Sequence, residues 1–205
     1  RTAQLWGKDE CKEASPDESA LLRILTTLSK LYTGKKAVST ASEVLEVFGG
    51  AGYVEDTGIP RLLRDSQVFP IWEGTTNVLS LDFLRALLKD SPFQVFDADI
   101  RKRLQSIPGH VTNPYAKNTL EELDQIGAWL KKNSTNNELL STNARGLAFA
   151  MAQVYIKSLL LEFSQQTQNS WDQEMSRRYF EKPVWRPLEA TQMIQLPELF
   201  KKFDT

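Results

Sequence analysis

The chain has 205 residues, of which 41% are hydrophobic and 25% charged, proportions typical of a globular protein. Its 25 Lys and Arg residues offset 26 Asp and Glu residues, so the net charge of -1 gives no overall attraction to nucleic acid or to an anionic membrane. One cysteine, Cys11, and one histidine, His110, exclude an internal disulfide and do not support a transition-metal site or a Cys–His catalytic pair. We expect an intracellular protein without a membrane span and leave open whether it is mitochondrial, peroxisomal or cytoplasmic.

The hydrophobic spacing predicts an all-α chain that opens with the end of a helix over 1–13 and continues with a long helix over 15–48. The segment 15–18 reads as a helix start, because Ser15 can cap, a proline suits the first turn and two acidic residues follow. Gly34 interrupts the long helix at a cost of roughly 1 kcal/mol relative to alanine. The glycine pair at 49–50 ends it, since glycine readily adopts the left-handed conformation found past helix ends.

A shorter helix is predicted over 57–68, followed by an extended link over 68–71, because the residue before Pro70 avoids the helical region. Thr75 or Thr76 should cap the next helix, which runs to about residue 89.

Prolines and a glycine between residues 89 and 115 indicate a domain boundary, so we predict domains over 1–92 and 93–205. The second domain should contain helices near 95–106, 116–133 and 138–168, the last of them central because apolar residues cover it broadly. The rest should comprise two aromatic-rich pieces and an irregular strap between them, over 171–182, 196–203 and 183–197.

Three motifs between the two long helices of the first domain carry the chemistry. They are the glycine turn Gly49-Gly50-Ala51-Gly52-Tyr53, the pair Arg64-Asp65 and the corner Ile71-Trp72-Glu73-Gly74-Thr75. The glycine turn does not fit the dinucleotide fingerprint, because Glu55 stands where the third glycine belongs.

Glu73 can be considered from its neighbours alone. Adjacent apolar residues disfavour its charged form, whereas the following helix N-terminus favours it, and the balance would suit a base near neutral pH. Gly74 beside it would let a ligand approach the backbone closely. The alternative from the residues alone is a solvated loop glutamate.

In this order and spacing, the motifs resemble the C-terminal helical domain of acyl-CoA dehydrogenases, over about residues 17–90. The resemblance implies a C-terminal helical bundle followed by an additional α-helical domain, in a homotetrameric FAD enzyme. In this family a glutamate, here Glu73, removes the proton alpha to the thioester of an acyl-CoA while hydride passes from the beta carbon to the flavin. The products would be a trans-2-enoyl-CoA and electrons passed to an electron-transfer flavoprotein or to oxygen.

The resemblance also assigns binding roles. Trp72, where many relatives have tyrosine, would line the acyl channel, Gly74 would lie against the thioester, and Arg85 would lie near the CoA nucleotide. Arg64 and Asp65 are most simply interpreted, from the residues themselves, as a structural ion pair that fixes the loop. Cofactor contacts would come from Glu46, Val47, Phe48, Gly49 and Gly50, reaching the FAD of a neighbouring subunit, and from Thr75, Thr76 and Asn77.

The Trp-Glu-Gly-Thr corner and the long helical extension resemble one branch in particular, the adaptive-response flavoproteins linked to alkylation damage. Two alternatives to the dehydrogenase stay open. The bulky Trp72 could block turnover, leaving a flavoprotein that binds acyl-CoA or fatty acid as a sensor or sequestering protein. Residues 93–205 could bind nucleic acid, although their basic pairs are scattered and balanced by acidic residues rather than forming a contiguous stripe.

Overall fold

The computed structural model describes residues 1–89, 92–109, 113–167 and 169–181, and within these ranges the chain is helical with no strand. This confirms the predicted all-α class. The predictions for His110, for the strap over 183–197 and for the piece over 196–203 lie outside the described residues. The chain forms two compact units, Arg1–Gln105 and Ser106–Thr205. The division between 92 and 93 drawn from the sequence stays a prediction.

Unit 1 is organised around the long helix α2 (Pro16–Val47), which begins as predicted. The Ser15 side chain accepts a hydrogen bond from the Glu18 backbone N–H, and the Glu18 carboxylate accepts one from the Ser15 N–H, which is a complete capping box. Before it, α1 (Thr2–Glu10) matches the predicted opening helix.

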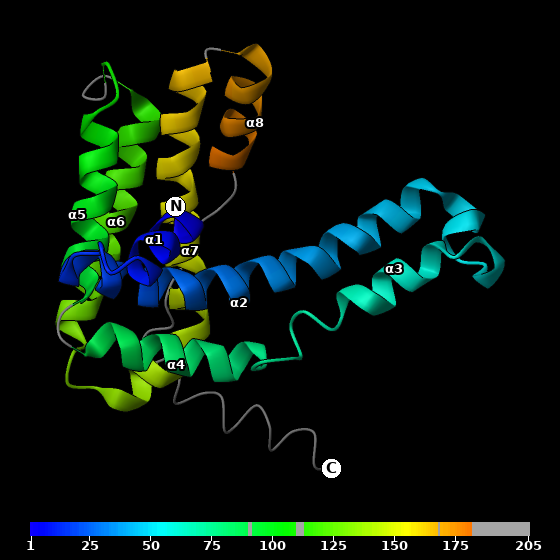
Figure 1. The fold of residues 1–205 in the computed structure, drawn as a ribbon, viewed down its shortest axis with the longest axis horizontal. Coiled ribbons are helices and arrows are strands. Elements are labelled where there is room, and N and C mark those ends of the chain that lie inside the picture. Colours follow the sequence, from blue (N-terminus) through cyan, green and yellow to red (C-terminus); the bar gives the residue numbers. More distant parts are fainter. Residues whose placement is uncertain (90–91, 110–112, 168, 182–205) are drawn as a thin grey trace, which may run out of the picture. The chain divides into compact units, whose positions relative to one another are not determined.

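The other helices of unit 1 pack along α2 in two groups (Figure 1). Helices α1, α4 (Thr76–Leu88) and α5 (Pro92–Gln105) pack against its N-terminal half, and α3 (Ile59–Ser66) runs beside its C-terminal half. Two short 3-10 turns, η1 (Gly49–Gly52) and η2 (Glu55–Thr57), connect α2 to α3. The buried apolar side chains of unit 1 gather in the first group and include Leu5, Leu21, Ile24, Leu28, Leu31, Phe83, Leu87 and Phe96.

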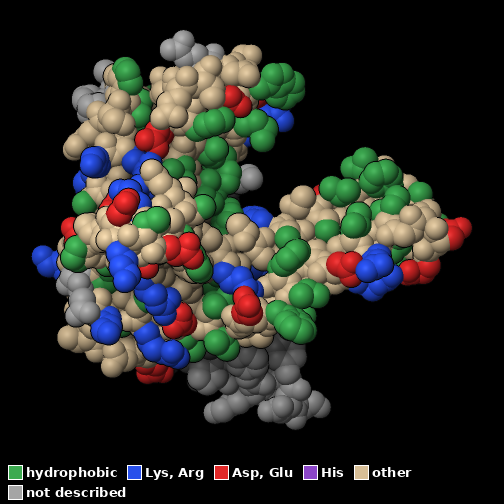
Figure 2. Space-filling view, in the orientation of Figure 1, with side chains coloured by type: hydrophobic (Ala, Val, Ile, Leu, Met, Phe, Trp, Pro, Cys, Tyr) green, Lys and Arg blue, Asp and Glu red, His purple; other side chains and the backbone are tan. Residues whose placement is uncertain are grey.

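The second group leaves many apolar side chains exposed. Figure 2 shows them over the C-terminal half of α2 and over α3. We call this surface the apolar arm, and its members include Val47, Phe48, Tyr53, Val54, Leu62, Val68, Phe69, Ile71 and Trp72. Exposed apolar patches, when they are large, usually mark an interaction site.

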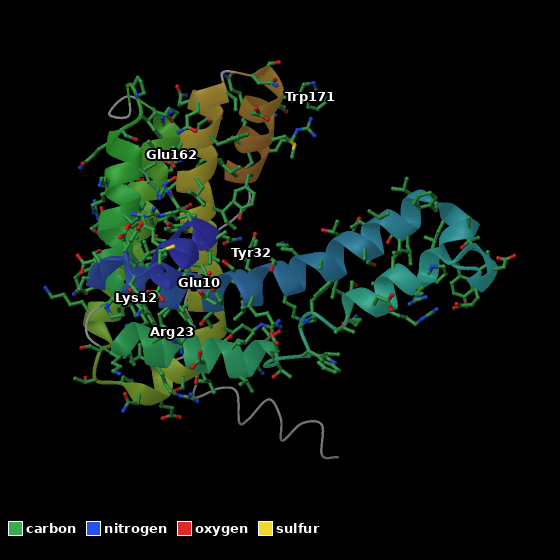
Figure 3. The ribbon with its side chains drawn as sticks, in the orientation of Figure 1. Glu10, Lys12, Arg23, Tyr32, Glu162 and Trp171 are labelled. Atoms are coloured by element: carbon green, nitrogen blue, oxygen red, sulfur yellow. The ribbon has the colours of Figure 1, made fainter. Side chains whose placement is uncertain are left out.

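Unit 2 consists of α6 (Pro114–Lys132), α7 (Asn137–Thr167) and α8 (Ser170–Phe180), with α7 packed against both others. Helix α7 is apolar and long enough to cross a membrane, with a mean hydropathy of 1.3 over its best window, but 56% of that window is buried. It is the predicted central helix. Trp171 points outward from α8, 74% exposed (Figure 3).

Candidate functional site

The corner that carries Glu73 lies in the turn between α3 and α4, and its backbone is unusual. Glu73 has φ +56, in the left-handed region that side-chain-bearing residues rarely adopt, and Gly74 has φ +108. Both residues lie immediately before α4, and the Glu73 side chain is exposed. The predicted base therefore stands on backbone in an unusual, left-handed conformation.

The segment before the corner is not the extended link predicted over 68–71. Consecutive turns run through it, because the N–H groups of Val68 and Phe69 donate to Asp65 and Ser66, and those of Ile71 and Trp72 both donate to Val68. A residue before proline prefers extended backbone, but this preference did not determine the conformation of the neighbouring residues. Their backbone is set by the hydrogen bonds of the turns.

Two residues of α2 lie against the turn over 68–72. Gly34 is buried, and a Cβ built on it would lie 3.3 Å from the carbonyl carbon and oxygen of Phe69 and 3.4 Å from the Pro70 nitrogen. The Lys30 ammonium donates to the Phe69 carbonyl oxygen and, at 2.7 Å, to the Trp72 carbonyl oxygen. Gly34 thus has a packing reason that helical periodicity could not show, and nothing in the sequence pattern pointed to Lys30.

The glycine turn at the far end of α2 is equally tight. Gly49 has φ +56. A Cβ on Gly52 would lie 2.1 Å from the Leu45 carbonyl oxygen, so any other residue would force the backbone to shift. A Cβ on Gly50 would meet nothing within 4 Å, so that face of the turn is open. The turn presents the exposed side chains of Glu46, Val47 and Phe48.

The predicted ion pair between Arg64 and Asp65 is wrong. Arg64 instead makes two hydrogen bonds of 2.8 Å to the Glu55 carboxylate, and Asp65 pairs with Arg61 at 3.1 Å. Adjacent helical residues point in different directions, so each found a partner of its own. The Arg64 guanidinium, chiefly by hydrogen bonding, lowers the pKa of the Glu55 carboxyl below its usual value.

Helix α4 begins at the corner without a side-chain cap. Thr75 is its N-cap residue, as predicted, but its hydroxyl makes no capping hydrogen bond. Thr75 and Asn77 are exposed, whereas Thr76 is buried. The first N–H groups of a helix lack partners within it and carry partial positive charge, so this end of α4 suits an anionic group.

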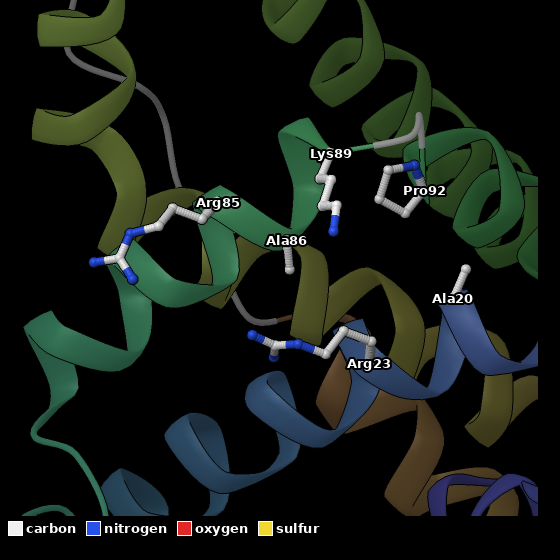
Figure 4. A pocket seen from close by; sticks show the side chains of 6 residues that line it. All are labelled: Ala20, Arg23, Arg85, Ala86, Lys89 and Pro92. Atoms are coloured by element: carbon white, nitrogen blue, oxygen red, sulfur yellow. The ribbon is translucent and has the colours of Figure 1, made fainter.

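A second polar feature lies further along α4. An open pocket of about 450 Å³ is lined by Arg23, Arg85, Lys89, Ala20, Ala86 and Pro92 (Figure 4). Arg23 makes hydrogen bonds of 2.8 and 2.9 Å to the Asp82 carboxylate, whereas Arg85 is 75% exposed and lies 4.0 Å from the same residue. Arg85 therefore keeps most of its guanidinium available to a ligand.

The predicted site residues fall in separate places along unit 1. The corner brings Trp72, Glu73 and Gly74 together with the start of α4, and Arg85 lies about two and a half turns further along that helix. The segment 46–50 lies at the opposite end of the apolar arm, across α3 from the corner (Figure 1).

Comparison with known proteins gives these features a family. The profile described as acyl-CoA dehydrogenase, C-terminal domain, matches residues 5–88, and the profile described as acyl-CoA dehydrogenase 11 C-terminal domain-like matches residues 92–195. The chain belongs to the acyl-CoA dehydrogenase family. It carries C-terminal domains of this family of flavoprotein oxidoreductases of fatty acid metabolism, whose members depend on FAD.

Individual relatives agree with this assignment. The chain is 38% identical over 190 residues to acyl-CoA dehydrogenase family member 11 of Caenorhabditis elegans, covering 86% of this chain and 30% of that protein. It is 36% identical over 91 residues to the putative acyl-CoA dehydrogenase AidB of Escherichia coli, covering 44% of this chain and 16% of that protein. A crystal structure of C. elegans ACDH-11 in complex with C11-CoA superposes with a TM-score of 0.90 at 34% identity, covering 100% of this chain and 36% of that one. The chain thus spans about a third or less of these relatives, and assignment to the adaptive-response branch stays a prediction.

Proposed function

We propose that the protein containing this chain is an FAD-dependent acyl-CoA dehydrogenase in which Glu73 is the base. The observation that carries the proposal is the corner itself, a carboxylate held in left-handed backbone between a turn and an uncapped helix start. The matching family profile spans this corner and supports the reaction class.

The residues of the corner suit the parts of an acyl-CoA. The exposed Glu73 carboxylate would take the proton from the carbon alpha to the thioester. Gly74 would let the thioester approach the backbone. A side chain is disfavoured at this position, because a Cβ would lie 3.0 Å from Leu79 and φ is positive. Trp72, 70% exposed, would line the acyl channel.

Two places along unit 1 fit an FAD molecule. The start of α4, with Thr75, Thr76 and Asn77, offers uncapped N–H groups to a phosphate. The segment 46–50 offers the open face of the glycine turn, where no atom lies within 4 Å of a Cβ on Gly50. When bound, FAD supplies the acceptor for the hydride that leaves the beta carbon. Because the two places lie at opposite ends of α3, we propose that segment 46–50 serves the cofactor of a neighbouring subunit in a homotetramer.

The cationic pocket suits the other end of the substrate. Arg85, with Lys89 beside it, would attract the phosphates of the CoA nucleotide, since both are donors to anionic oxygens. An electron-transfer flavoprotein, or oxygen, would then accept the electrons from the reduced enzyme.

Glu73→Gln in the full-length protein tests the proposal. The protein is purified with its flavin, oxygen is excluded, and saturated acyl-CoAs of increasing length are added while flavin absorbance is followed. We expect the wild type to bleach with a preferred chain length and the variant to keep its flavin and bind acyl-CoA without bleaching. Tight binding by the wild type without bleaching would contradict the dehydrogenase and favour the sensor or sequestering protein.

Nucleic-acid binding by residues 93–205 gains little support from the side chains. Arg101 pairs with Asp97 at 2.7 Å, and Arg103 pairs with Asp99 at 2.8 Å. Arg177 and Arg178 both pair with Glu174. These cations are neutralised by carboxylates on their own helices, so they provide a poor counter-charge for phosphates.

A further inference from the structure

We propose that Lys30 is a positioning residue that sets the backbone of Glu73 for proton abstraction, an inference that rests on the proposed function. Lys30 lies on α2, far in sequence from the corner. Its ammonium nevertheless donates to two carbonyl oxygens of the turn, those of Phe69 and Trp72, the latter at 2.7 Å.

The contact with the Trp72 carbonyl acts directly on Glu73. That carbonyl belongs to the planar peptide unit whose nitrogen is the backbone nitrogen of Glu73. Holding the carbonyl on Lys30 therefore fixes the plane from which φ of Glu73 is measured. Glu73 sits at φ +56, a region that costs energy for any residue with a Cβ, so an external contact is needed to favour it.

The turn has few other anchors to α2. The side chains of Phe69, Ile71 and Trp72 are 56%, 57% and 70% exposed, so they bury little that could hold the turn in place. The backbone hydrogen bonds within the turn end on the carbonyls of Asp65, Ser66 and Val68.

Within the described part of the chain, the hydrogen bonds to the Phe69 and Trp72 carbonyls come from Lys30. Because Gly34 has no Cβ, α2 can lie close to Phe69 and Pro70, within reach of the lysine on the same helix.

The chemistry of lysine suits this role. An ammonium carries three donors and no acceptor, so one group can satisfy two carbonyls that face it from different directions. Methionine has a similar length and no donor, so Lys30→Met removes both hydrogen bonds while keeping most of the packing. Arginine keeps several donors on a longer, planar group, so Lys30→Arg should restore part of the restraint.

The experiment compares these two variants with Lys36→Met in the full-length flavoprotein. Lys36 lies on the same helix, but its ammonium lies over the Tyr32 ring, 5.6 Å from the ring centre. Four quantities are measured: FAD per subunit, acyl-CoA affinity from the flavin spectrum, the rate constant of anaerobic flavin reduction at saturating acyl-CoA, and hydrogen exchange over residues 66–75.

We expect Lys30→Met to keep its FAD and its acyl-CoA affinity and to be reduced about 10²-fold more slowly, the cost of displacing a reacting group by about 1 Å. Amide exchange over 66–75 should quicken, because the turn has lost its anchor. Lys30→Arg should be reduced at an intermediate rate, and Lys36→Met at the wild-type rate.

Several outcomes would overturn the inference. One is reduction of Lys30→Met at the wild-type rate, and another is a loss confined to acyl-CoA affinity. If Lys30→Met does not retain FAD, the test rests on Lys30→Arg. A Lys30→Arg protein that retains FAD and shows no change in the rate of flavin reduction or in hydrogen exchange contradicts the proposal. Failure of the proposed function is seen separately, as a wild type that binds acyl-CoA and is not reduced; accelerated exchange in Lys30→Met would then mark a structural anchor only.

Discussion

Gly52 offers the sharpest test of the backbone geometry in unit 1. A methyl group at this position would lie 2.1 Å from the Leu45 carbonyl oxygen, and an ordinary contact begins at 3.4 Å, so the carbonyl must withdraw by about 1.3 Å. That carbonyl accepts the hydrogen bond from the Phe48 N–H at 3.1 Å, which closes the last turn of α2. Overpacking of about 1–3 kcal/mol and a lost hydrogen bond of about 1 kcal/mol give an expected destabilisation of about 2–4 kcal/mol for Gly52→Ala.

The neighbouring glycines provide matched controls. Gly50→Ala meets nothing within 4 Å and should be nearly neutral. Gly49→Ala has open space but a φ of +56, which should cost about 1–2 kcal/mol. Hydrogen exchange over residues 45–58 of the full-length protein should be slowest in Gly50→Ala, faster in Gly49→Ala and fastest in Gly52→Ala. The thermal midpoint should fall in the same order. Equal exchange in Gly52→Ala and Gly50→Ala would refute the steric reasoning.

Three further predictions concern other parts of the chain. In the wild type the Glu122 carboxylate pairs with Lys157, whose side chain is 3% exposed, so Lys157→Met leaves that carboxylate without its ion-pair partner. It should lower the thermal midpoint by the equivalent of about 3 kcal/mol, and adding Glu122→Gln should recover most of the loss. Hydrogen bonds from Arg177 and Arg178 lower the pKa of Glu174 to about 2. The stabilisation of α8 that these bonds give is therefore complete above about pH 4.5 and lost as the pH falls toward 2. Amide hydrogen exchange in α8, corrected for intrinsic rates, should accelerate in that window. In a Glu174→Gln variant this acceleration should be absent. Gly34→Ala would press on the Phe69 and Pro70 backbone at 3.3–3.4 Å and should slow flavin reduction by less than Lys30→Met does, with no loss of FAD.

Local chemistry made much of the fold predictable. The capping box at Ser15, the glycine stop at the end of α2 and the α3 helix follow from interactions within a few residues of one another. The central position of α7 follows from the apolar residues that cover most of its surface. The same holds for the corner, where Glu73, Gly74 and Thr75 stand together in sequence and remain together in space.

Contacts between distant segments were not predictable in this way. Lys30 is an ordinary lysine in a helical pattern, and its hydrogen bonds depend on where the turn over 67–73 lies in the folded chain. The partner of Arg64 could not be chosen from sequence, because Asp65 and Glu55 are both near and only the direction of the side chain decides. Hydrophobic spacing alone does not reveal that the apolar arm is exposed, since the exposure of a residue such as Val47 depends on what else is present to cover it.

The contacts that shape unit 1 around the candidate site share one physical feature: they act on backbone carbonyl groups. Lys30 donates to the carbonyls of Phe69 and Trp72, Gly34 leaves room for that same Phe69 carbonyl, and Gly52 leaves room for the carbonyl of Leu45. A side chain anchored by apolar burial can shift by small steps as its neighbours change. A peptide group held by a hydrogen bond or a backbone contact has far fewer alternatives. A base that removes a proton from carbon must be positioned to within a fraction of an ångström, and a backbone held in this way helps to position it. If Glu73 is the base, as proposed above, these contacts would hold its backbone in place although the turn itself is exposed.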